Sequence, residues 1–184
     1  MGVSFFQRGR VNLERVCNMK EVVLGIGNTL KGDDGIGIYI AEKIDKYLKE
    51  ASKKSKQAKL TRTGREVIAI SCGTTPENYT SIIRKHHPNK LILVDAADMG
   101  LSPGSYRIIP PEKIEVMHIS THDIPLSIFI SYVSEFCDDI ILIGIQPDKM
   151  DIGTALSSTV QKSGDRVANL IIEKRLNEIK PLKT

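Results

Sequence analysis

Three separated segments of the sequence each place a metal-capable side chain beside an apolar run. They carry the carboxylates of Asp34 and Asp95 and the imidazole of His122. If the apolar runs form an open parallel sheet, the carboxyl ends of its strands line one crevice, where ligands bind. Two carboxylates and one imidazole at that edge would make a metal site with open coordination positions.

Each of these residues also has a plainer structural interpretation. Asp33 and Asp34 suit a helix N-terminus, and because two adjacent acids cannot both serve one cap, we expect one to cap and the other to reach into the crevice. Asp95 ends an apolar strand, where a carboxylate is costly unless it is paired, capping or bound to a cation. His122 alone would be an ordinary loop histidine, and His118 is a weaker candidate for the site.

Strands and helices alternate along the part of the chain that carries these residues. Continuous apolar, β-branched runs predict buried strands at residues 22–26, 91–94 and 140–145. A further strand is predicted at 67–71 and an edge strand at 106–109. Helices are predicted at 35–50, 77–86, 124–136 and 159–179. This order predicts an α/β sandwich with a mostly parallel sheet. His86 and His87 then fall at the opposite edge of the sheet from the candidate site.

One domain of residues 19–184 accounts for the whole periodic pattern. Residues 1–18 do not fit it, and they are either a flexible N-terminal arm or the product of an upstream start codon. No segment approaches the roughly 18 apolar residues of a membrane span, and the first residues do not resemble a signal peptide. We therefore expect a cytoplasmic protein without membrane insertion.

Charge and cysteine usage exclude several classes of function. The net charge is +4, and much of the excess lies at residues 49–65, where no aromatic side chain offers a stacking platform for nucleic acid. The three cysteines, Cys17, Cys72 and Cys137, are scattered, which argues against a disulfide framework and a zinc ribbon. We expect Cys72 and Cys137 to pack in the interior rather than to act as nucleophiles.

Other catalytic motifs fail on their spacing. The Gly25–Gly27 pair lacks the third glycine of a dinucleotide-binding loop, and the two acids that follow would repel a pyrophosphate. The sequence contains no P-loop, no Gly-x-Ser-x-Gly elbow and no His-Glu-x-x-His helix.

Five segments in the same order resemble the nickel–iron hydrogenase maturation endopeptidases, which trim the C-terminal extension of the hydrogenase large-subunit precursor. They are residues 24–37, 72–78, 93–104, 120–126 and 144–148. Single segments are weak signals, but five in order are specific. The segments at 94–100 and 144–147 look most like the branch that serves hydrogenases of the hydrogenase-3 type.

The resemblance implies a three-layer α/β/α sandwich around a twisted sheet of about five strands, similar to phosphorylase/hydrolase folds. It implies that Asp34, Asp95 and His122 are both the catalytic and the nickel-binding residues of an enzyme classed with the aspartyl proteases. The nickel would be supplied by the precursor, with no organic cofactor, and we expect a monomer. Two other roles remain open: a non-catalytic nickel-dependent docking or chaperone module for the same precursor, and a self-processing aspartic-type peptidase.

Four further residues are expected to shape the cleft around these three. They are Asp33, Gly73, Thr74 and Asp98.

Overall fold

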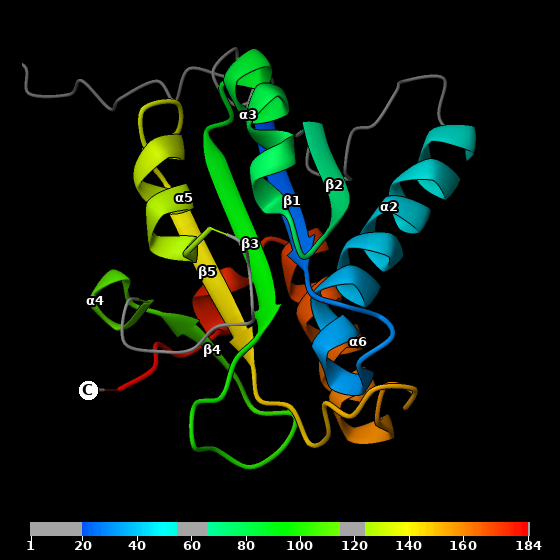
Figure 1. Ribbon diagram of the computed structural model, residues 1–184. Helices are drawn as coiled ribbons and strands as arrows, with labels where there is room; N and C mark the ends of the chain where they lie inside the picture. Colours follow the sequence, from blue (N-terminus) through cyan, green and yellow to red (C-terminus); the bar gives the residue numbers. More distant parts are fainter. Residues whose placement is uncertain (1–19, 55–65, 115–123, 184) are drawn as a thin grey trace, which may run out of the picture.

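The computed structural model describes residues 20–54, 66–114 and 124–183. Its centre is a five-stranded sheet with the order β2-β1-β3-β5-β4 (Figure 1). Neighbouring strands are parallel except at one edge, where β4 runs antiparallel to β5. The strands are β1 (Lys20–Ile26), β2 (Glu66–Gly73), β3 (Lys90–Ala96), β4 (Tyr106–Ile109) and β5 (Ile140–Ile145). The predicted α/β class and the mostly parallel sheet of five strands are confirmed.

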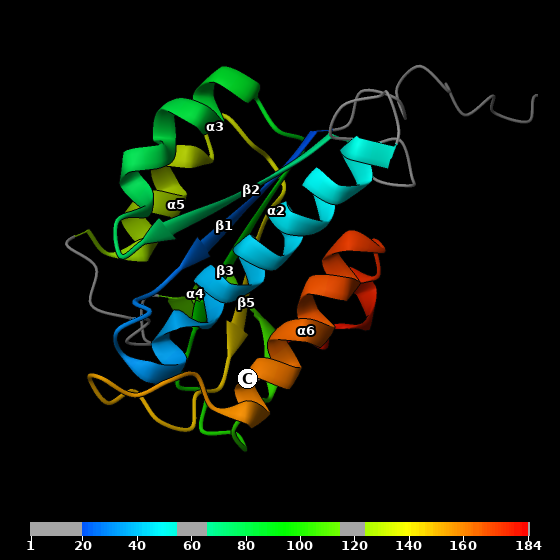
Figure 2. The same cartoon turned by 90° about the vertical axis from the view of Figure 1, so that its right-hand side faces the viewer.

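Helices cover both faces of this sheet (Figure 2). On one face lie α2 (Ile36–Lys54) and α6 (Ser158–Ile172), and on the other lie α3 (Thr80–His86) and α5 (Leu126–Val133). The shorter elements are η1 (Gly32–Gly35), η2 (Pro76–Tyr79), α4 (Pro111–Ile114) and η3 (Leu176–Glu178). The three-layer arrangement is therefore present. Within the described ranges, no helix combines the length and the apolar character that crossing a membrane requires.

The sheet separates two hydrophobic cores. Side chains of β1, β3 and β5 alternate between them, so that neighbours such as Ile92 and Leu93, both fully buried, pack on opposite faces. This two-sided burial explains why the strands read as continuous apolar runs rather than as alternating patterns.

The predicted closing helix at 159–179 is wrong at its C-terminal end, because α6 stops at Ile172. Lys174 adopts a left-handed conformation with φ 61°. The N–H of Arg175 donates to the carbonyl of Leu170, and that of Lys174 to the carbonyl of Ile171, which together form a Schellman cap. Glycine is the usual residue at this position, so a lysine there gives no stop signal in the sequence.

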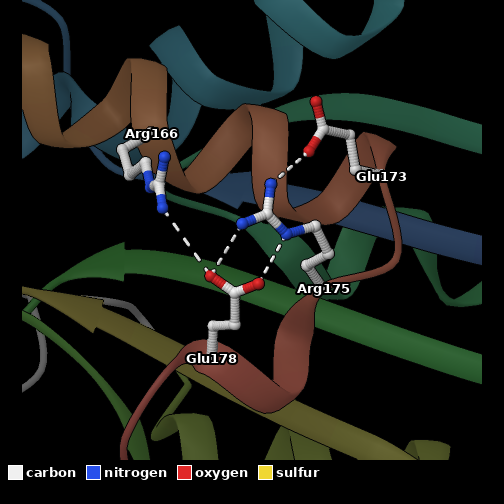
Figure 3. A network of polar contacts seen from close by, with 4 residues as sticks. All are labelled: Arg166, Glu173, Arg175 and Glu178. Atoms are coloured by element: carbon white, nitrogen blue, oxygen red, sulfur yellow. Dashed lines mark hydrogen bonds and ion pairs between the residues drawn. The ribbon is translucent and has the colours of Figure 1, made fainter.

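A network of charged side chains holds the chain after this cap (Figure 3). The guanidinium of Arg175 donates to Glu173 at 2.7 Å and to both carboxylate oxygens of Glu178 at 2.5 and 3.0 Å, and Arg166 lies 3.6 Å from Glu178. Hydrogen bonds from Arg175 hold the pKa of Glu178 below its ordinary value. The network therefore ties η3 to the end of α6.

The two ends of the sheet have different surroundings. The predicted placement of His86 and His87 is confirmed, because α3 ends beside the amino ends of the strands, where Asn89 N–H donates to the carbonyl of Lys20. The loops that follow β1, β3 and β5 gather at the opposite, lower end in Figure 1. This lower end is the carboxyl edge, where the candidate site residues were expected.

Candidate functional site

A pair of glycines lets α2 approach the sheet very closely. A Cβ atom at Gly37 would lie 2.2 Å from the carbonyl oxygen of Ile26 and 2.3 Å from that of Val94, and one at Gly25 would lie 2.1 Å from the carbonyl oxygen of Gly37. The start of α2 is therefore in backbone contact with the carboxyl ends of both β1 and β3. This contact fixes the turn η1 against the sheet.

Asp34 lies in η1 and Asp95 lies near the end of β3. Both carboxylates are buried, and η1 contacts β3 directly. The Ala96 N–H donates to Asp95 Oδ1 at 2.8 Å. Gly27, with φ 134°, packs so tightly that a Cβ atom would lie 1.8 Å from the Asp34 carbonyl oxygen. The two predicted carboxylates thus lie at the same edge of the sheet, one in the turn that follows β1 and the other in the adjacent strand β3.

His122 and His118 lie outside the described residues. In the part of the chain that the structure describes, no group of three His, Cys, Asp or Glu side chains could hold a metal ion. Asp34 and Asp95 are two oxygen donors, so a nickel site there needs further ligands from elsewhere in the chain or from a substrate. The assignment of these two carboxylates and His122 stays a prediction.

Asp33 does not cap the helix that follows it. Its Oδ1 accepts the Ser157 N–H at 2.6 Å, and its Oδ2 accepts the N–H groups of Asp148 and Lys149 at 2.8 and 3.0 Å and the Ser157 hydroxyl at 2.9 Å. All four donors belong to the loop between β5 and α6. Sequence reasoning missed this role because the donors lie more than a hundred residues away along the chain.

These donors also determine the ionisation of Asp33. Burial by itself raises the pKa of this carboxyl, but the backbone N–H groups of Ser157, Lys149 and Asp148 and the Ser157 hydroxyl outweigh it, so the pKa lies below its ordinary value. A buried carboxylate that accepts four hydrogen bonds is a fixed anchor, and it joins η1 to the loop after β5.

Gln146 braces the loop that follows Asp95. Its side-chain oxygen accepts the N–H groups of Met99 and Leu101 at 2.7 and 3.2 Å, and its side-chain nitrogen donates to Asp98 Oδ1 at 3.1 Å. The hydrogen bond from Gln146, with that from the Gly100 N–H, holds the pKa of Asp98 below its ordinary value. Asp98 is exposed on this loop, and its part in shaping the cleft stays a prediction. The bracing role of Gln146 was not predicted, although Gln146 stands in one of the five family-like segments.

Gly73 and Cys72 end β2 at the same edge. The Gly27 N–H donates to the carbonyl of Gly73, and this hydrogen bond joins the ends of β1 and β2. Gly73 itself has φ 62°. Cys72 is buried, and burial, with the negative charge of Glu77, raises its pKa to about 12. A thiol with that pKa is almost wholly protonated near neutral pH, which fits the predicted packing role and not a nucleophile.

A family model described as hydrogenase maturation protease matches residues 38–174, which include Asp95 but not Asp34. A putative hydrogenase maturation protease of Methanocaldococcus jannaschii is 36% identical over 163 residues, 88% of this chain and 92% of the relative. The hydrogenase 3 maturation protease of Escherichia coli K12 is 39% identical over 131 residues, 71% of this chain and 74% of the relative.

Solved structures agree with these sequence matches. The crystal structure of a hydrogenase 3 maturation protease superposes with a TM-score of 0.71 at 31% identity, covering 90% of this chain and 98% of the other. The crystal structure of a nickel–iron hydrogenase maturation protease from Thermococcus kodakarensis gives 0.68 at 32% identity, covering 88% and 96%.

Proposed function

This chain belongs to the hydrogenase maturation protease family, and we propose that it removes the C-terminal extension of a nickel–iron hydrogenase large-subunit precursor after nickel insertion. The observation that supports this proposal most directly is the pair of buried carboxylates at the carboxyl edge, Asp34 in the turn after β1 and Asp95 in the adjacent strand β3. We place the reaction in the cytoplasm and expect the enzyme to act as a monomer.

In the proposed reaction, water adds to the scissile carbonyl carbon, the C–N bond breaks, and the leaving amine takes up a proton. Asp34 or Asp95, when ionised, would accept the proton of the attacking water. Nickel enters with the precursor and is part of the substrate. We propose that Asp34, Asp95 and His122 contact this nickel, which either polarises the carbonyl or holds the bond beside the base.

The test is to incubate the purified protein with nickel-loaded and nickel-free precursor and to measure the mass of the precursor. Loss of the C-terminal extension is expected only from the nickel-loaded precursor. Asp34→Asn, Asp95→Asn and His122→Ala should each abolish this loss. Asp138→Asn is the matched control, because Asp138 is an exposed carboxylate before β5, at the opposite edge.

The outcomes separate the proposal from its alternatives. An unchanged precursor mass with binding still detectable would favour a docking or chaperone module. Cleavage of nickel-free precursor at the same rate would remove nickel from the recognition step. Shortening of the enzyme's own chain during incubation would favour the self-processing peptidase.

A further inference from the structure

Two of the most exposed large apolar side chains in the described residues lie on neighbouring loops of the carboxyl edge. Leu30, in the loop after β1, is 71% exposed, and Ile152, in the loop after β5, is 86% exposed. Met150, on the same loop as Ile152, is 39% exposed. Single exposed apolar residues are common on protein surfaces, so exposure alone does not mark Leu30, Met150 and Ile152 as a binding surface. Their arrangement on two joined loops is more specific.

The two loops are joined backbone to backbone. The Gly153 N–H donates to the carbonyl of Leu30 at 2.8 Å, which places Leu30 next to the residue that follows Ile152. Gly32, with φ 57°, lies so close to the second loop that a Cβ atom would be 2.6 Å from the carbonyl oxygen of Lys149. In both views of the molecule the loop after β1 runs beside the start of α2, and the loop after β5 passes below it (Figures 1 and 2).

Hydrogen bonds to Asp33 hold these two loops together. Its buried carboxylate accepts hydrogen bonds from Asp148, Lys149 and Ser157, at both ends of the segment that carries Met150 and Ile152. The exposed side chains therefore stand on a backbone that is already ordered before any partner binds. Such pre-organisation lowers the entropic cost of binding.

The position of these loops indicates what would cover them. Leu30 precedes Asp34 by four residues, and the second loop follows β5, the strand paired with β3 and Asp95. Both loops lie at the carboxyl edge that also carries Asp34 and Asp95, so a polypeptide bound at these carboxylates has the loops as neighbours.

We propose that Leu30, Met150 and Ile152 form a docking rim for an apolar surface of the precursor next to its cleavage site. This inference rests on the proposed function and adds the surface by which the folded part of the substrate is held. Rigid apolar side chains at the border of a substrate site are typical of interface anchors.

The test is the double variant Leu30→Ser/Ile152→Ser, assayed with nickel-loaded precursor. We expect KM to rise ~10-fold or more, with kcat within about twofold of wild type, because the rim binds ground state and transition state alike. The thermal midpoint should stay unchanged, since both side chains are exposed. Ile128→Ser is the matched control: Ile128 is 59% exposed on α5, away from the rim, and should leave KM unchanged.

Several results would overturn the inference. If the wild type cleaves the precursor and the double variant has the same KM, the rim is not a docking surface while the proposed function stands. If the wild type does not cleave, equilibrium binding of the precursor decides, and equal or absent binding to both proteins rejects the rim. Concentration-dependent dimerisation that the double variant loses would assign the rim to a second copy of this chain instead.

Discussion

At the scale of single residues, Asp33 and Asp34 show that adjacent identical side chains can have different tasks. The carboxylate of Asp33 accepts hydrogen bonds from the loop after β5, whereas Asp34 lies in the turn that contacts β3. A sequence pattern cannot separate the two, because the difference lies in which distant backbone groups each carboxylate meets.

Replacing Asp33 by asparagine tests the anchor. The amide puts an NH2 group against N–H donors, so at least one of the four hydrogen bonds is lost and donors of Asp148, Lys149 or Ser157 lose their acceptor. We expect the free energy of unfolding to fall by about 1–3 kcal/mol. Urea denaturation followed by circular dichroism measures this change. Asp98→Asn is the control, because Asp98 is exposed and should change stability far less.

At the scale of elements, α2 and α6 are held together on their outer side by Asp165. Its Oδ1 accepts hydrogen bonds from Lys43 Nζ at 2.5 Å and from the Tyr39 hydroxyl at 2.6 Å. These contacts from Lys43 and Tyr39 hold the pKa of Asp165 below its ordinary value. The bridge therefore needs the carboxylate form and links two helices that cover the same face of the sheet.

The pH dependence of this bridge follows from the direction of the shift. A carboxyl whose pKa is lower in the folded state adds stability above its unfolded pKa, and this contribution disappears as the pH falls through the folded value. The destabilisation by Asp165→Asn should therefore be fully present at pH 7 and should shrink as the pH is lowered toward 2. The loss at pH 7 should stay below about 1 kcal/mol, because both partners are more than a third exposed. Thermal unfolding of both proteins across this pH range measures the difference, and a constant difference down to pH 2 would contradict the assignment.

At the scale of the whole molecule, the sheet makes two cores depend on each other. Ile92 faces the core under α2 and α6, and its neighbour Leu93 faces the core under α3 and α5. We expect Ile92→Ala and Leu93→Ala each to cost about 2–5 kcal/mol and each to shift a single cooperative transition. Urea denaturation measured by circular dichroism and by tyrosine fluorescence should give coincident curves. Separate transitions for either variant would mean that the two cores unfold independently.

Much of the fold was predictable because its central strands, β1, β3 and β5, are buried on both faces. The four apolar runs gave every parallel strand to within a few residues, and Tyr106–Ile109 was placed correctly as an edge strand. The end of α6 was not predictable, since the left-handed turn at Lys174 is set by hydrogen bonds to the preceding turn and not by a glycine.

The candidate site was only partly predictable. Asp34 and Asp95 were expected at one edge because strand ends in a parallel sheet meet there, and the structure places them so. The roles of Asp33 and Gln146 were not predictable, because each depends on loop backbone far away in the sequence. His122 lies outside the described residues, so its part in the site remains a prediction.

The dependence of one long loop on a single carboxylate has a kinetic consequence. The N–H groups of Asp148, Lys149 and Ser157 share the acceptor Asp33, so full exposure of this carboxylate to solvent requires all of these hydrogen bonds to break. The loop and the turn that carries Asp34 should therefore open as one unit, with one rate. Motions of the substrate rim and of the catalytic turn would then be synchronous.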